Sequence, residues 1–210
     1  MNIILFGPQG SGKGTQARLL CEKFGFFYFE SGAYLRKLGE EHPEIKAIME
    51  AGKLVPDEEF TSYLTAYLDE QNLYDDILFD GFPRTLEQFN FLKNWLEDKK
   101  VSIDLGVVIQ ISEEETVKRL SSRRMDPETG KIYNLITDKP PAEINLNKLV
   151  QRDDDHPEAI RKRLAWYKDR VVPLINYLKN VTKVIEIDGE RPIDEIQKDI
   201  VLEIEKLQNG

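Results

Sequence analysis

The chain has few cysteines and no long apolar runs. Cys21 is the single cysteine among 210 residues, so no internal disulfide and no cysteine-rich metal site can form. It shares an expected helix face with Ala17 and Leu20, which favours a packed thiol over a nucleophile. No apolar run approaches the roughly 20 residues that cross a bilayer. Strand-forming residues begin at Asn2 and leave no room for a signal peptide, so we expect a cytoplasmic protein without a membrane partner.

Positive charge is also scarce. Lysine and arginine total 29 against 38 aspartate and glutamate, a net charge of −9. A nucleic-acid backbone demands a basic surface, so nucleic acid is not the expected partner. A protein this acidic that handles phosphate groups must gather its cations locally, so the placement of its arginines is informative. The length suits one sizeable core with room for inserted subdomains.

The most informative segment is residues 7–15, Gly-Pro-Gln-Gly-Ser-Gly-Lys-Gly-Thr, which directly follows the apolar run at residues 3–6. A strand, a glycine-rich turn and a helix-forming segment are the context of a phosphate-binding loop, whose backbone N–H groups surround one anion. Lys13 can then reach the terminal phosphates. Gly14 follows Lys13, so the hydroxyl falls on Thr15. An ordinary glycine turn is the alternative, but the full loop with its lysine favours a nucleotide site.

Short apolar runs alternate with helical patterns along most of the chain. This alternation predicts an α/β protein of the P-loop type, a three-layer fold whose parallel five-stranded sheet is covered on both faces. The expected strands are residues 2–6, 26–29, 77–80, 105–111 and 184–187. Asp57 can cap the helix after it, and Thr85 with Gln88 and Ser112 with Glu115 fit capping boxes.

Three features interrupt the alternation. Residues 31–55 are helical in pattern without a strand, and residues 123–155 are too long for an ordinary loop. The apolar content of the second stretch indicates a folded lid. Pro173 lies inside a helical pattern from about residue 157 to 178, which it should kink or divide.

A second motif, Asp80-Gly81-Phe82-Pro83-Arg84-Thr85, follows the strand at residues 77–80. A carboxylate at the carboxyl end of a parallel strand lies where α/β sheets bind ligands. Beside a phosphate loop, Asp80 is expected to hold Mg²⁺ through water, and Arg84 offers a planar fork to an anion. Read alone, the segment could be a capped turn with a solvated arginine. Arg119, Arg123, Arg152 and Arg163 bracket the lid and suggest a shared anion on closure.

These motifs, with Ser31-Gly32 and Arg36, Gly52 to Val55, Gly130 to Tyr133 and Arg152 to Asp155, occur in the order typical of one family. Over essentially its whole length, the chain resembles bacterial adenylate kinase of the long-lid type. The resemblance implies a monomer that reversibly transfers a phosphoryl group from MgATP to AMP, giving two ADP. It also implies a core of residues 1–29, 56–121 and 156–210, an AMP-binding flap at 30–55 and a lid at 122–155.

The resemblance further implies residue roles. The ATP-binding set would be Gly10, Ser11, Gly12, Lys13, Gly14, Thr15, Arg119, Arg123, Ile132, Tyr133 and Arg191. The AMP-binding set would be Ser31, Arg36, Lys53, Leu54, Val55, Gly81, Phe82, Pro83, Arg84, Gln88, Arg152 and Arg163. The catalytic set would be Lys13, Arg84, Arg123, Arg152 and Arg163, with Mg²⁺ held through water near Thr15 and Asp80. Gln88 has a competing role as the capping partner of Thr85.

Several positions depart from the family pattern. Many relatives have threonine at Ser31 and aspartate at Ala33, beside the acceptor nucleotide, so a monophosphate other than AMP stays open as the acceptor. Some relatives hold the lid with zinc and four cysteines, whereas this lid has Asp126 and Thr129 near the first pair, so no structural zinc is expected. A UMP or CMP kinase, a GTP-dependent donor site and a non-catalytic nucleotide sensor remain alternatives. A purely structural role would not require the glycine loop.

Overall fold

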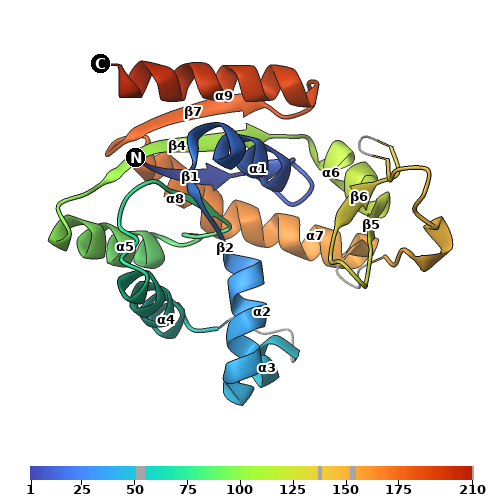
Figure 1. The fold of residues 1–210 in the computed structure, drawn as a ribbon, viewed down its shortest axis with the longest axis horizontal. Coiled ribbons are helices and arrows are strands. Elements are labelled where there is room, and N and C mark those ends of the chain that lie inside the picture. The colour runs from blue at the N-terminus through green and yellow to red at the C-terminus, as the bar shows by residue number, and fades with distance from the viewer. Residues whose placement is uncertain (51–54, 137–138, 152–154, 210) are drawn as a thin grey trace.

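The computed structural model describes residues 1–50, 55–136, 139–151 and 155–209. Its centre is a sheet of five parallel strands in the order β2-β3-β1-β4-β7 (Figure 1). The strands are β1 (Asn2–Phe6), β2 (Phe27–Glu30), β3 (Ile77–Asp80), β4 (Ile103–Gln110) and β7 (Lys183–Asp188). All five predicted strands are confirmed, with ends shifted by at most two residues.

Helices cover both faces of the sheet and make the predicted three layers. In β1, Ile3 and Leu5 pack on the face covered by α1 and α9, while Ile4 and Phe6 pack on the face covered by α4, α5 and α8. Cys21 is partly buried against the first of these clusters, as predicted for a packed thiol. The helices are α1 (Lys13–Phe24), α2 (Ser31–Glu41), α3 (Pro43–Glu50), α4 (Asp57–Glu70), α5 (Leu86–Asp98), α6 (Glu113–Ser121), α7 (Pro157–Trp166), α8 (Val172–Leu178) and α9 (Ile193–Gln208).

A buried asparagine joins the amino ends of three strands. The Asn2 amide nitrogen donates to the carbonyl oxygens of Tyr74 at 3.0 Å and Ser102 at 3.1 Å. Its amide oxygen accepts from the Ile77 backbone N–H at 3.1 Å. Because a buried amide is costly without partners, this bonding ties β1 to the segments that enter β3 and β4.

Two segments lie away from the sheet (Figure 1). Helices α2 and α3 extend beyond the carboxyl end of β2, and β5 (Arg123–Met125) pairs antiparallel with β6 (Ile132–Asn134). A 3₁₀ turn, η1 (Leu146–Lys148), follows this hairpin. The described part of residues 123–155 therefore contains regular structure, as predicted, although the two strands were not predicted. Its turn is held by hydrogen bonds, including Thr129 Oγ1 to Asp126 Oδ2 at 2.8 Å. Among the described residues, no helix is both long and apolar enough to span a bilayer.

Pro173 divides the long helical pattern, as predicted. Helix α7 ends at Trp166, a π-helical turn (η3, Tyr167–Val171) follows, and α8 begins at Val172. A proline has no N–H to give the carbonyl four residues earlier, and its ring crowds that carbonyl. The chain adapts with a wider turn, in which the Val172 N–H donates to the Tyr167 carbonyl five residues before it.

The predicted cap of α4 is wrong by one residue. Pro56 occupies the cap position, and Asp57 is the first helical residue. The Asp57 carboxylate instead accepts from Thr85 Oγ1 at 2.6 Å and from Gln88 Nε2 at 2.7 Å, two donors of the neighbouring helix. Thr85 does cap α5, accepting from the Gln88 N–H at 3.1 Å. Gln88 Oε1, however, accepts from the Arg84 N–H at 2.7 Å rather than from Thr85.

Candidate active site

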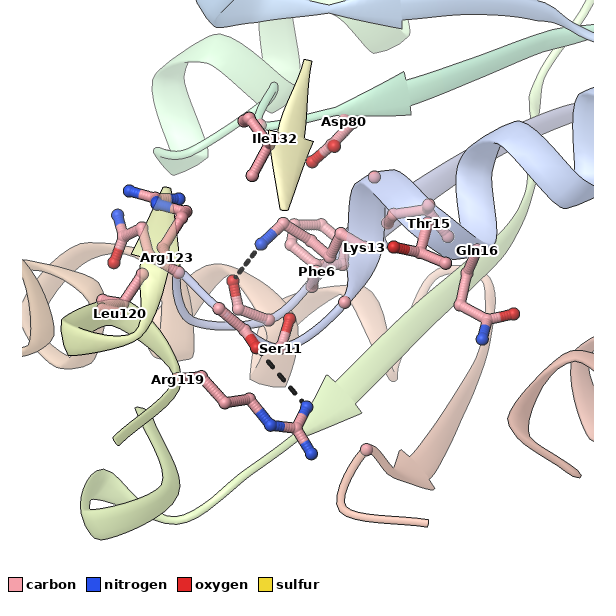
Figure 2. A pocket seen from close by; sticks show the side chains of 18 of the residues that line it. Phe6, Ser11, Lys13, Thr15, Gln16, Asp80, Arg119, Leu120, Arg123 and Ile132 are labelled. Carbon is pink, nitrogen blue, oxygen red and sulfur yellow. Dashed lines mark hydrogen bonds between the residues drawn. The ribbon is translucent and has the colours of Figure 1, made fainter. Parts of the chain in front are cut away.

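The glycine-rich segment forms the turn between β1 and α1. Gly12, at φ 94°, caps α1 in a left-handed conformation that favours glycine. The loop therefore leads directly into the amino end of α1, where the unpaired N–H groups and the positive end of the helix dipole lie. Lys13 folds back over the loop, and its Nζ donates to the carbonyl oxygens of Gly7 at 2.8 Å and Pro8 at 3.1 Å (Figure 2). This arrangement suits a bound phosphate group.

The loop forms part of a cleft of about 980 Å³. Residues of β1, α1, β2, α2, β3, α6, the β5–β6 hairpin, α7, η3 and the segment from β7 into α9 also line it. Nine lysines and arginines line the cleft among the described residues, against five aspartates and glutamates. In a chain of net charge −9, this is the local concentration of cations that an anionic ligand requires.

Several charged groups of the cleft act on Lys13. Burial lowers the pKa of the Lys13 ammonium, while the Asp80 carboxylate opposes that shift. The guanidinium groups of Arg84, Arg163 and Arg123 lower the pKa further. These arginines come from the turn after β3, from α7 and from the start of β5, so three distant segments place positive charge around one lysine.

The carboxyl end of β3 offers oxygen ligands to the cleft. Asp80 is nearly buried, and its Oδ2 accepts from the Tyr28 hydroxyl at 3.0 Å. Burial and then the Asp80 charge raise the pKa of Tyr28, so the phenol stays protonated and donates. A carboxylate here and the Thr15 hydroxyl, which also lines the cleft, are the hard oxygen donors that Mg²⁺ prefers. Among the described residues, no group of three or more histidine, cysteine, aspartate or glutamate side chains is placed to hold a metal ion.

Arg84 is fixed by the turn that carries it. Its Nε donates to the Gly81 carbonyl, and its Nη2 donates to Ser31 Oγ at 3.1 Å. The Ser31 hydroxyl donates in turn to the Gly81 carbonyl at 2.8 Å. Burial lowers the pKa of Arg84, and Asp80 opposes the shift. The guanidinium is thus held on one edge by β3 and α2, and it lines the cleft with the rest.

A smaller pocket of about 160 Å³ adjoins the cleft and shares Ser31, Gly81, Arg84 and Trp166 with it. Its other lining residues are Leu35, Val55, Asp57, Phe60, Thr85, Gln88 and Arg170. Apolar rings and aliphatic side chains therefore surround a few amide and carboxylate groups, which suits a flat polar ring.

The lid side of the cleft carries a second group of arginines (Figure 2). Arg119 Nε donates to the Glu115 carboxylate at 2.8 Å, and its Nη1 approaches the Gly10 carbonyl at 3.4 Å. Glu115 itself follows the confirmed cap of α6, where Ser112 Oγ accepts the Glu115 N–H at 3.1 Å. Its carboxylate binds Arg119 rather than closing a capping box.

Arg123 forms an ion pair with a buried aspartate, Asp155. Its Nε and Nη2 donate to the two carboxylate oxygens of Asp155, at 2.8 and 2.5 Å. Asp155 is completely buried and Arg123 is 14% exposed, so the pair fixes the guanidinium at the start of β5. Arg191, at the opposite rim, is paired with Asp199.

Most of the residues predicted for the site converge on the cleft. Its lining includes Gly10, Ser11, Gly12, Lys13, Gly14, Thr15, Ser31, Arg36, Gly81, Pro83, Arg84, Arg119, Arg123, Ile132, Tyr133, Arg163 and Arg191. Val55 and Gln88 line the smaller pocket. Phe82 lines neither, because its ring is buried among Phe29, Phe60 and Phe79. Lys53, Leu54 and Arg152 lie outside the described residues.

Three residues of the site were not predicted. Tyr28 precedes the expected ligands and reaches Asp80 only through the pairing of β2 with β3. Asp155 belongs to the Arg152 to Asp155 motif, but no role was predicted for it, because its partner Arg123 is distant in sequence. Trp166 could have been found, because it lies three residues after Arg163 and therefore on the same face of α7.

A phosphate loop at the carboxyl edge of a parallel sheet, facing arginines from several segments, defines a P-loop nucleotide phosphotransferase. The profile described as "Adenylate kinase" matches residues 5–183. The chain is also similar to adenylate kinases of Petrotoga mobilis (39% identity over 95% of both chains) and Kosmotoga olearia (36%, over 99% of this chain and 100% of that one). The Pyrococcus furiosus enzyme is 37% identical, over 93% of this chain and 92% of its own. The chain belongs to the adenylate kinase family, whose reaction is reversible phosphoryl transfer from ATP to AMP.

Proposed function

We propose that this chain transfers the terminal phosphoryl group of MgATP to AMP, giving two ADP, and that each nucleotide enters from its own side of the cleft. Residues 10–15 bind the donor phosphates, with Arg119, Ile132, Tyr133 and the Arg191 backbone around the rest of ATP. The smaller pocket beside Ser31, Val55 and Gln88 takes the acceptor base. Arg36 and Arg84 bind the acceptor phosphate.

The main support is the set of charges around Lys13. Phosphoryl transfer needs little covalent help from a protein, because catalysis is positioning and neutralisation of charge on the transferring oxygens. Arg84, Arg123 and Arg163 all act on the pKa of Lys13, so their charges reach the same region of the cleft. A protein that only bound a nucleotide would not need cations from both the donor side and the acceptor side of the cleft.

Asp80 and Thr15 would hold Mg²⁺ through water, and the ion would offset the negative charge of the donor phosphates. Lys13 balances the transferring oxygens as a point charge, and Arg84 orients the acceptor phosphate through its planar fork.

We also propose that residues 30–55 form the acceptor subdomain and residues 122–155 a lid, on a core of residues 1–29, 56–121 and 156–210. Closure excludes water, which would otherwise accept the phosphoryl group and waste ATP. Distances between the two inserts should contract when a bisubstrate analogue that joins both nucleotides is added. We further propose that the protein acts as a cytoplasmic monomer.

The direct test offers ATP and Mg²⁺ with AMP, UMP, CMP or GMP separately and measures ADP by chromatography. Formation of ADP with AMP alone is the expected result. Turnover with UMP or CMP instead would identify a different monophosphate kinase, and tight ATP binding without turnover would identify a sensor. Replacing ATP with GTP tests the donor site in the same assay.

A matched pair of lysine variants assigns the reaction to this cleft. Lys13→Met should lower kcat by orders of magnitude with an unchanged circular dichroism spectrum. Lys23→Met, on the outer side of α1 where Lys23 pairs with Glu205 at 3.1 Å, should leave kcat unchanged. A Lys13→Met variant that retains nearly normal kcat would contradict the assignment.

A further inference from the structure

Trp166 stands where the cleft and the smaller pocket meet. It is the last residue of α7, and it lines both cavities. Its side chain also packs against the large core cluster on the α5–α8 face of the sheet. The π-helical turn that follows, forced by Pro173, begins at the next residue. Trp166 is therefore held between the rigid core and the two cavities.

The Arg84 guanidinium lies over the ring of Trp166. Arg84 Cζ lies 6.0 Å from the centroid of the Trp166 ring, within the range of a cation–π contact. Arg84 is bonded on one edge to Gly81 and Ser31. Arg84 and Trp166 both line the cleft and the smaller pocket, so a ligand that occupies the two cavities meets both side chains.

We propose that Trp166 is a positioning and specificity residue of the acceptor site: its ring holds the Arg84 guanidinium toward the acceptor phosphate and forms a flat wall against the acceptor base. This inference rests on the proposed function, since it takes the smaller pocket to be the acceptor pocket. The acceptor class is a nucleoside monophosphate, which has an anionic end for Arg84 and a planar ring for the indole.

The position of the second tryptophan, Trp95, allows the fluorescence of Trp166 to be measured alone. The chain has two tryptophans, and Trp95 lines neither cavity. Its Nε1 contacts Asp69 at 3.3 Å, and its ring lies 5.7 Å from that of Tyr74. A Trp95→Phe parent therefore retains Trp166 as its only indole. Titrating this parent with AMP alone should change the Trp166 emission, with saturation at the AMP dissociation constant that calorimetry gives. An emission that AMP never moves would overturn the inference.

Kinetics of Trp166→Leu and Trp166→Tyr complete the test. Loss of a desolvated cation–π contact corresponds to about a 5- to 30-fold change in an equilibrium constant. We expect Trp166→Leu to raise KM for AMP by about that factor with KM for ATP unchanged, and Trp166→Tyr, which keeps an aromatic face, to recover most of it. Thermal melting of both variants checks that the fold is retained.

A Leu variant with normal KM for AMP, or a Tyr variant no better than Leu, would overturn the positioning role while the parent still makes ADP. A parent that makes no ADP from ATP and AMP would instead overturn the proposed function, and this inference with it.

Discussion

Replacing Gly81 with alanine would place a methyl group between the two side chains that form the acceptor edge. At φ +75°, the new Cβ would lie 2.6 Å from Ser31 Oγ and 2.9 Å from Arg84 Nη2, where ordinary contact begins at 3.4 Å. Arg84 and Ser31 would both have to retreat, and misplacement of a reacting group by about 1 Å can cost on the order of 100-fold in rate. The left-handed backbone adds about 1–2 kcal/mol of lost stability.

The control variant Gly25→Ala separates the displacement of Arg84 and Ser31 from the strain of the left-handed backbone. Gly25 ends α1 at φ +77°, nearly the backbone angle of Gly81, but its new Cβ would meet no atom within 4 Å. We expect both variants to lose about 1–2 kcal/mol in urea denaturation. Only Gly81→Ala should lose kcat/KM for AMP, by about 100-fold in steady-state assays. Equal activity in the two variants would refute the claim that the Gly81 turn sets the position of Arg84.

Three other expectations concern charge and hydrogen bonding. Because burial lowers the pKa of Lys13 from 10.5 and catalysis needs its charged form, kcat/KM should fall with rising pH at a pH below 10.5, and Lys13→Arg should abolish this alkaline limb. Tyr28→Phe removes the donor to Asp80 and should raise the Mg²⁺ concentration for half-maximal activity about tenfold, with KM for AMP unchanged. Asp155→Asn weakens the bidentate contact to Arg123 and should lower the free energy of unfolding by about 2 kcal/mol in urea; an unchanged midpoint would contradict this.

The strands and the phosphate loop could be predicted because their signals are local. Apolar runs of four to eight residues bounded by turn residues specify buried parallel strands without reference to the rest of the chain. Pro173 likewise acts on its own helix, since its missing N–H and its ring affect only the preceding turn. The loop at residues 7–15 and the strand before it contain all that a phosphate cradle needs.

Most of the errors and omissions involve partners in other segments of the chain, whereas Gln88 and Glu115 leave their predicted capping boxes for nearby arginines. Aspartate is a residue type that often caps helices, but the Asp57 carboxylate accepts hydrogen bonds from Thr85 and Gln88, at the start of α5, instead. Strands β5 and β6 have three residues each, too few to carry a period-two signal, so their pairing defines them. Tyr28 and Trp166 belong to the site only because adjacent strands and the end of α7 bring them to it.

The hydrogen bonds of Asn2 have a consequence for how such an enzyme can change. They anchor the sheet at the margin opposite the phosphate loop, so the frame is secured far from the groups that select a nucleotide. New acceptor preferences can therefore be tried at Ser31, Gln88 or Trp166 without loosening the scaffold that presents them. The contacts that stabilise the sheet lie at one edge, and the residues that bind nucleotides lie at the opposite edge.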